Sequence, residues 1–125
     1  MTIDDSRMVR VMRGAARIQE LLDWGPIAAR SGTDPASAVS RTRGALLYKG
    51  PAGAPEAGVW ECTPGAWECR VARDEFCHFL AGRCVYTHDS GERTELGAGD
   101  AAFFPAGWSG RCEVNETVRK VYVIL

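Results

Sequence analysis

The sequence has no long hydrophobic run, no excess of charge of one sign and no paired-cysteine motif. No stretch approaches the roughly 20 consecutive apolar residues that span a membrane as a helix. The first five residues, Met1-Thr2-Ile3-Asp4-Asp5, are acidic, where a secretory leader has a basic start followed by an apolar run. The 15 Lys and Arg side chains nearly balance the 16 Asp and Glu side chains, so no overall field attracts nucleic acid or an anionic membrane surface. These absences predict a cytoplasmic protein with neither a nucleic-acid partner nor a membrane partner.

The five cysteines follow no disulfide pattern. Their number is odd, none forms a C-x-x-C motif, and all lie in segments with strand character: Cys62, Cys69, Cys77, Cys84 and Cys112. A secreted disulfide framework usually has an even set of cysteines in loops. Free cysteine is among the most buried residue types, so these side chains are predicted to be free thiols in an apolar core.

A chain of 125 residues with 46% hydrophobic and 25% charged residues matches one globular domain, since two cores of half this size would each be marginal. Residues 1–40 are predicted to form an N-terminal arm and loop, and residues 41–125 the barrel domain described below. Apolar residues at helical spacing over 8–22 permit a helix in the arm. Gly14 and the alternation before it instead suit a short strand followed by a turn. Both interpretations stay open, and Trp24-Gly25-Pro26 is expected to end either element, because the residue before a proline avoids the helical region.

From residue 41 onward the pattern changes to short apolar runs separated by turn residues. Runs at a spacing of about ten residues, with no long helical pattern between them, indicate an antiparallel sandwich or barrel. The predicted strands cover 44–48, 59–62, 67–72, 76–80, 84–87, 101–104, 112–114 and 118–125. Segments 31–40 and 49–58 are rich in turn residues and are predicted to be loops. The predicted fold class is therefore all-β.

Two spaced motifs make the pattern more specific. Glu75 is followed seven residues later by Gly82, and residues 99–107 read Gly-Asp-Ala-Ala-Phe-Phe-Pro-Ala-Gly. These segments resemble the cupin motifs E-x(6)-G and G-D-x(4)-P-x-G. Segments 58–65, 75–78 and 116–120 resemble the small single-domain cupin family of unknown function that is related to the ethanolamine-utilisation cupin and to ureidoglycine aminohydrolase.

The resemblance implies a cupin-type antiparallel jelly-roll β-barrel over residues 41–125, with a short N-terminal arm. It also implies a barrel mouth that holds a small ligand, and a homodimer in which strands of two subunits pair. Gly82 and Gly99 stand where one strand is expected to turn into the next.

The usual cupin metal site is incomplete in this sequence. The family pattern has three imidazoles and one carboxylate, of which only the carboxylate, Glu75, is retained. The six residues before it include no histidine, and Gly110 stands at the position of the third imidazole. Such sites need about three protein donors, so the sequence predicts no metal and no other cofactor. An atypical zinc site formed by Glu75, Cys77 and Cys112, with Cys69 nearby, stays open as an alternative.

Strand periodicity identifies the polar residues of a candidate ligand site. Side chains two apart share a face of a strand, so Glu75 and Cys77 point inward together, and the resemblance places Cys112 inward as well. Glu75 is the candidate catalytic and ligand-binding group. In an apolar barrel its carboxyl group must be protonated, reach water or pair with a base such as Arg70 or Arg73.

Three tryptophans complete the candidate ligand site. Trp60, Trp67 and Trp108 either stack on a planar ligand at the barrel mouth or pack in the core. The sequence thus predicts that a small polar metabolite binds in the barrel. Two alternatives stay open: a metal-independent or atypical-metal enzyme of small-molecule metabolism, similar to ureidoglycine aminohydrolase, and a structural or regulatory dimerisation module. A structural subunit predicts a barrel filled by Trp and Phe side chains.

Overall fold

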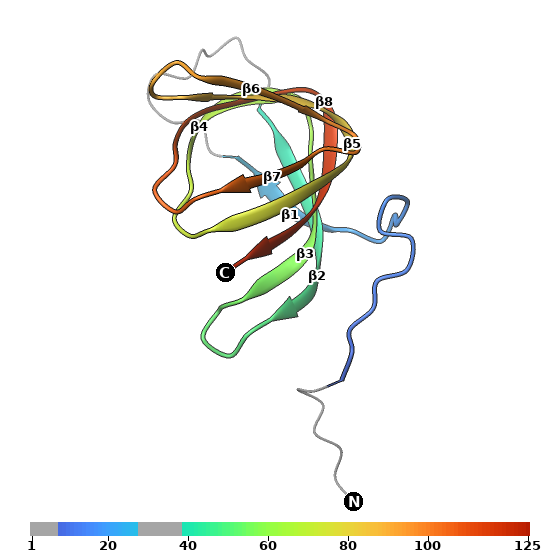
Figure 1. Cartoon of the computed structure of the whole chain (residues 1–125). Coiled ribbons are helices and arrows are strands. Elements are labelled where there is room, and N and C mark those ends of the chain that lie inside the picture. Colours follow the sequence, from blue (N-terminus) through green and yellow to red (C-terminus); the bar gives the residue numbers. More distant parts are fainter. Residues whose placement is uncertain (1–7, 28–38) are drawn as a thin grey trace, which may run out of the picture.

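The computed structural model describes residues 8–27 and 39–125, and within them it contains eight strands and no helix (Figure 1). The strands are β1 (Leu22–Pro26), β2 (Arg41–Lys49), β3 (Glu56–Cys62), β4 (Gly65–Arg70), β5 (Glu75–His88), β6 (Arg93–Gly97), β7 (Ala101–Phe104) and β8 (Ser109–Ile124). The loop predicted over 49–58 is shorter, because β2 continues to Lys49 and β3 begins at Glu56. A membrane-crossing helix of sufficient length and apolar character is not found in the described part of the chain. The prediction of an all-β protein is confirmed.

The strands form one strongly curled antiparallel sheet. Their order is β1-β2-β3-β8-β5-β6, and in addition β4 pairs with β8 and β7 pairs with β5. The long strand β8 pairs with β3 through residues 118–124 and with β4 through residues 109–114. In the same way, β5 pairs with β7 near its start and with β6 near its end. These two strands therefore run through both halves of the jelly roll and pair with each other along most of their length (Figure 1).

Gly82 lies at a bend within β5, and the expectation that it turns one strand into the next is wrong. The predicted strands 76–80 and 84–87 both lie within β5. Gly82 has φ +84°, and a Cβ added to it would lie 2.1 Å from the carbonyl oxygen of Thr117 on β8. The register between β5 and β8 shifts on both sides of this point, so bulges bend the strands where a turn was expected. Gly99, with φ +92°, lies between β6 and β7 as predicted.

A similar continuity joins two predicted strands near the end of the chain. Segments 112–114 and 118–124 belong to β8, which runs without a break from Ser109 to Ile124. Residues 115–117, which separate the two predicted runs, lie where β8 bends along with β5. Sequence composition alone does not distinguish a bend in a long strand from a turn between two short ones.

The arm forms no helix within residues 8–27. A turn covers 13–17, with Gly14 at φ +63°. Trp24-Gly25-Pro26 form the last three residues of β1, which ends at Pro26. β1 is an edge strand, where a proline is tolerated since it removes no hydrogen bond that a second neighbour needs. Because β1 pairs with β2, the sheet begins before residue 41; most of the predicted loop 31–40 lies outside the described residues.

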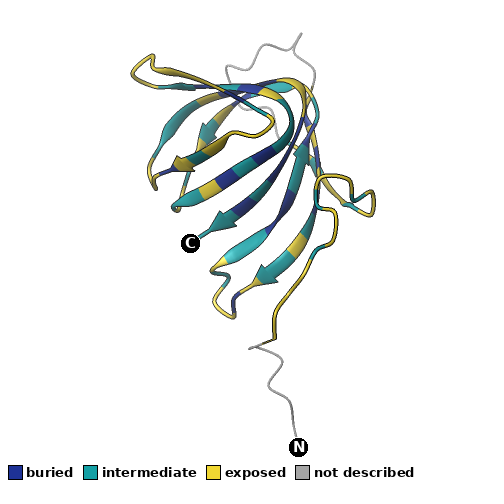
Figure 2. Ribbon diagram, turned by 45° about the vertical axis from the view of Figure 1, so that its right-hand side comes forward, coloured by how far each residue is buried: buried dark blue, intermediate teal, exposed yellow. Residues whose placement is uncertain are grey.

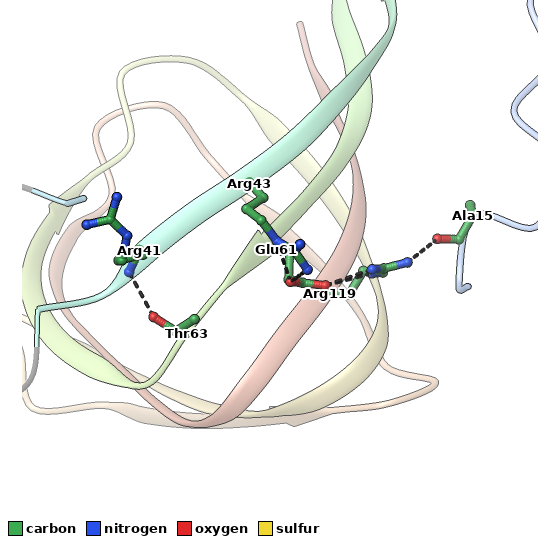
Figure 3. Close-up of polar contacts among 6 residues, drawn as sticks. All are labelled: Ala15, Arg41, Arg43, Glu61, Thr63 and Arg119. Atoms are coloured by element: carbon green, nitrogen blue, oxygen red, sulfur yellow. Dashed lines mark hydrogen bonds and ion pairs between the residues drawn. The ribbon is translucent and has the colours of Figure 1, made fainter. Parts of the chain in front are cut away.

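An ion-pair cluster on the outer face of the sheet holds the arm. Arg119 on β8 pairs with Glu61 on β3 (Nη2 to Oε2, 2.7 Å), and Arg43 on β2 pairs with the same carboxylate (Figure 3). Burial tends to raise the pKa of Glu61, but hydrogen bonds and charge from the two guanidinium groups outweigh it and lower that pKa. Arg119 also donates a hydrogen bond to the backbone oxygen of Ala15 (3.2 Å). The arm is thereby attached to the strand that completes the barrel.

Buried residues alternate with more exposed ones along β2, β5 and parts of β8 (Figure 2). The core therefore lies inside the curled sheet, on the face that these buried residues share. Its buried cluster consists of Cys62, Trp67, Cys77, Phe79, Cys84, Tyr86, Leu96, Phe104, Cys112, Val114, Val118 and Tyr122. As predicted, Cys62, Cys77, Cys84 and Cys112 are buried free thiols, whereas Cys69 is half-buried. Burial raises the pKa of Cys62 and Cys84 to about 11 and that of Cys77 to about 12. These thiols are therefore neutral core side chains at neutral pH.

Candidate ligand-binding site

An open cavity of about 540 Å³ lies inside the barrel. Small-ligand sites typically have volumes of roughly 300–1,000 Å³ and apolar walls with a few polar groups. The aromatic side chains on this wall are Trp24, Trp60, Trp67, Tyr86, Phe104 and Tyr122. Its charged side chains are Glu56, Arg70, Arg73, Glu75 and Lys120. The cavity thus has the size and the wall chemistry of a small-ligand site.

Trp24 reaches the cavity from the edge strand β1. Gly44, on the neighbouring strand β2, has no side chain at the place that the indole ring occupies. A Cβ added to Gly44 would lie 2.1 Å from an atom of the Trp24 ring. The glycine therefore allows the indole to approach the backbone of β2 and to extend the aromatic wall.

The polar centre of the cavity is an ion pair between Glu75 on β5 and Lys120 on β8. Lys120 Nζ lies 3.1 Å from Glu75 Oε2, and the side chains are 9% and 20% exposed. The Cys77 thiol donates a hydrogen bond to the same carboxylate oxygen (3.1 Å), and Lys120 donates to Cys77 Sγ (3.4 Å). Lys120 Nζ also lies 4.7 Å from the centroid of the Trp60 ring, a favourable cation–π distance. The ammonium group is thereby held by a carboxylate, a thiol and an indole.

The contacts at this polar centre determine the protonation of Lys120 and Cys77. Burial alone would lower the pKa of Lys120, but the charge and hydrogen bond of Glu75 outweigh it and raise the pKa to about 12. Cys77 keeps its proton because burial raises the pKa of the thiol to about 12. At neutral pH, Lys120 is therefore an ammonium cation and Cys77 a neutral thiol.

A second polar contact lies on the same wall. Tyr122 donates a hydrogen bond to Glu56 Oε2 (2.7 Å), and Lys49 Nζ lies 3.7 Å from Glu56 Oε1. Burial, followed by the contact with Glu56, raises the pKa of Tyr122. Glu56 therefore has a hydrogen-bond donor and a cation of its own, separate from the pair of Glu75 and Lys120.

The structure brings some of the predicted site residues together. Glu75 and Cys77 share the polar centre, and Trp60 and Trp67 line the cavity. Trp108 does not line it. This indole packs edge-on against Phe104, with ring centroids 5.5 Å apart, and so supports the wall from behind.

Cys112 is part of the core and does not reach the cavity wall. Burial raises the pKa of its thiol, which also contacts Tyr86. Arg70 and Arg73 do line the cavity, but the base that pairs with Glu75 is Lys120. Arg73 instead donates a hydrogen bond to the backbone oxygen of Leu125 (2.8 Å).

Sequence reasoning missed Lys120, Glu56 and Tyr122. A usable signal was strand periodicity on β8, since Lys120 and Tyr122 follow Val118 at intervals of two and all three are buried. The run Arg119-Lys120 concealed it, because two adjacent cations suggest a solvated face. Only the pairing of β5 with β8 shows which of the two faces the carboxylate of Glu75.

The residues present do not fit the usual cupin metal. Within residues 8–27 and 39–125, no group of three or more His, Cys, Asp or Glu side chains is placed to hold a metal ion. The alternative of zinc held by Glu75, Cys77 and Cys112 therefore has no support in the geometry, and neither has Cys69 as an added ligand. At Glu75, the one retained ligand position, the ammonium group of Lys120 already faces the carboxylate. A second cation there would be repelled by it.

The jelly roll and the cavity inside it define a cupin-type barrel. A family model described as the EutQ-like cupin domain matches residues 49–122, more than half of the chain. The chain belongs to this EutQ-like cupin family. No curated protein matches the sequence.

Solved structures share the fold. A protein of unknown function of the DUF861 family from Pseudomonas syringae pv. tomato str. DC3000 has a TM-score of 0.71 and 24% identity, over 84% of this chain and 44% of its own. This chain thus spans less than half the length of that relative. The EutQ protein of Clostridium difficile has a TM-score of 0.59 and 18% identity, over 73% and 70%. A DUF861 family protein from Thermotoga maritima has a TM-score of 0.53 and 30% identity, over 54% and 76%.

Proposed function

We propose that the protein binds a small polar metabolite in the cavity of its barrel. The observation that carries the proposal is the buried ion pair of Glu75 and Lys120 on the wall of an open, aromatic-lined cavity. Taking two charges out of water is costly, and apolar residues of similar volume often stabilise a fold as well as a buried ion pair does. A few polar groups that converge in an otherwise apolar cavity are typical of a ligand site.

The alternative of a purely structural subunit requires a filled barrel. Although Trp24, Trp60, Trp67 and Phe104 line the interior, they leave about 540 Å³ between them. This volume supports ligand binding over a structural role. The proposed function is binding without catalysis, because the ion pair of Glu75 and Lys120 can recognise a ligand without any reaction.

Native mass spectrometry of the intact chain, combined with Glu75→Gln, tests the proposed binding. The wild type is expected to retain a small molecule, or to gain one from a panel of polar metabolites, and Glu75→Gln is expected to lose it. Glu95→Gln is a matched control, because Glu95 forms an exposed ion pair with Arg93 away from the cavity (74% and 63% exposed). Unchanged binding in Glu75→Gln, or a wild type that retains nothing and responds to no compound, would contradict the proposal.

We also propose that two copies pair through the outer sheet face that carries Phe76 and Phe103. These residues are register partners on β5 and β7 and are 43% and 57% exposed. A pocket of about 220 Å³ adjoins Phe76, and its lining includes Leu47, Val121 and Val123 together with Met12 and Ala15 of the arm. Contiguous apolar patches of this kind mark interaction sites, and an isologous dimer buries the same patch of both subunits.

A cytoplasmic location is the remaining part of the proposal. Four buried free thiols support it, because free cysteines persist where the compartment is reducing. The near balance of acidic and basic side chains supports a small-molecule ligand over nucleic acid or a membrane surface.

A further inference from the structure

The ion pair in the cavity leaves hydrogen-bonding capacity unused. Both bonds to Glu75, from Lys120 and from Cys77, go to Oε2. Oε1 of Glu75 accepts no hydrogen bond from the described residues. An ammonium group has three donors, of which Lys120 uses one for Glu75 and one for Cys77. Nζ also lies 4.7 Å from the centroid of the Trp60 ring, but within the described residues its third N–H has no conventional hydrogen-bond acceptor. The cavity wall thus presents an unused acceptor beside an unused donor.

The charges of this polar centre already compensate each other. Glu75 and Lys120 together carry no net charge, and Glu56 has Lys49 and Tyr122 as partners. A ligand carboxylate would meet the carboxylate of Glu75, and a ligand ammonium group would meet that of Lys120. Either charge would face a like charge at this polar centre, which is costly. The two other cations on the wall, Arg70 and Arg73, are exposed side chains outside the pair of Glu75 and Lys120. The group that fits best is neutral and carries both a donor and an acceptor.

The shape of the wall restricts the rest of the ligand. The indoles of Trp60 and Trp67 line the cavity, and Tyr86 and Phe104 pack against each other with ring centroids 4.7 Å apart. Aromatic side chains favour stacked or edge-to-face contacts with other rings. A planar ligand that carries the polar group uses this wall better than a flexible chain does.

We propose that the ligand is a planar compound with a neutral amide-type group, in which an N–H lies beside a C=O. The N–H donates to Oε1 of Glu75, and the carbonyl oxygen accepts from Nζ of Lys120. This inference rests on the proposed function and specifies the chemical class of its ligand. A site built around paired donors and acceptors rejects an analogue that leaves one of them unsatisfied.

Matched aromatic probes test the assignment. Benzamide and the fused lactam 2-quinolinone carry the adjacent N–H and C=O. N,N-dimethylbenzamide lacks the N–H, benzoate is an anion, and benzylamine is a cation. Benzyl alcohol carries its donor and its acceptor on one hydroxyl oxygen. Each compound is titrated into the intact chain by calorimetry and by tryptophan fluorescence, for which Trp60 and Trp67 are reporters in the cavity wall.

Benzamide and 2-quinolinone are expected to bind at least tenfold more tightly than the four other probes. The double variant Glu75→Gln/Lys120→Met removes both charges at nearly constant volume, and it is expected to bind all six probes with similar, weak affinity. Glu95→Gln is expected to behave as the wild type. Circular dichroism and a cooperative melting transition check that the double variant is folded.

Three outcomes would overturn the amide assignment. They differ in whether the cavity still binds a ligand and whether that binding needs the ion pair. Preferred binding of benzoate, benzylamine or benzyl alcohol would replace the ligand class and leave the proposed function standing. Equal binding of all probes, unchanged in the double variant, would show that the aromatic wall binds ligands without the ion pair. No binding of any probe would reject the class, and native mass spectrometry of the purified chain would then decide the proposed function separately.

Discussion

Lys120 differs from an ordinary surface lysine in every contact that it makes. Its side chain is almost fully buried, and its Nζ faces Glu75, Cys77 and the ring of Trp60. In solution a lysine ammonium group is strongly hydrated, so the protein must replace that hydration with the carboxylate of Glu75. The two residues therefore depend on each other, and the effect of changing one depends on whether the other is present.

Lys120→Met is expected to destabilise the protein by about 3 kcal/mol, because it leaves the carboxylate of Glu75 without its cation in a mostly apolar site. Adding Glu75→Gln to this variant is expected to recover most of the loss, since no buried charge then remains. Urea unfolding followed by circular dichroism measures both effects. Additive losses in the double variant would contradict the coupling of the two residues.

Stability is expected to fall as the pH rises above about 8.5, the pKa of an exposed thiol. Cys62, Cys84 and Lys120 have folded-state pKa values raised to about 11, about 11 and about 12. Each group holds its proton more tightly in the folded chain than in the unfolded chain, so unfolding releases protons and higher pH favours it. The loss begins with the thiols and continues, through Lys120, toward about pH 12.

Urea midpoints measured across this pH range check the alkaline loss. Cys84→Ala removes one of the titrating thiols and is expected to make the pH dependence shallower at alkaline pH. A midpoint that stays constant up to about pH 11 would show that these thiols are exposed in solution.

At the scale of the elements, the bend in β5 is the feature with the strictest residue requirement. Gly82 combines a positive φ with close approach to the carbonyl oxygen of Thr117, whereas Gly99 has a positive φ with no atom near its missing side chain. Gly82→Ala is expected to cost about 3 kcal/mol, from backbone strain and from the clash. Gly99→Ala is expected to cost about 1 kcal/mol, from strain alone.

Chemical unfolding of the two glycine variants separates these contributions. If both lose the same stability, the close approach of β5 and β8 does not contribute. Both glycines belong to the cupin motifs. Gly82 allows β5 and β8 to approach closely, whereas Gly99 provides only a positive φ between β6 and β7.

The elements also show why part of the structure was predictable. Short apolar runs and the motif residues Glu75, Gly82 and Gly99 were sufficient for the fold class and for placing Glu75 and Cys77 on one inward face. The merging of four predicted runs into the two long strands β5 and β8 was not predictable, because a bend and a turn have the same composition. Nor was the partner of Glu75, since the choice between Arg70, Arg73 and Lys120 depends on which strand lies beside β5.

At the scale of the whole molecule, the exposed outer face predicts self-association. Phe103→Glu places a charge at the centre of the proposed interface without touching the cavity or the ion pair. The wild type is expected to sediment as a dimer at micromolar concentration, and the variant as a monomer of 13.6 kDa. A monomeric wild type, or an unchanged dimer in the variant, would place the contact elsewhere or exclude it.

The pairing of β5 with β8 has a consequence for synthesis of the chain. Glu75 leaves the ribosome 45 residues ahead of Lys120, and β3 has its second neighbour only when residues 118–124 have followed. Until then Glu75 has no cation to pair with. The apolar faces of β3 and β5 are also exposed to solvent, because β8 is not yet present to pair with these strands. The barrel therefore cannot close gradually during translation, and the nascent chain needs protection from aggregation until its last strand has emerged.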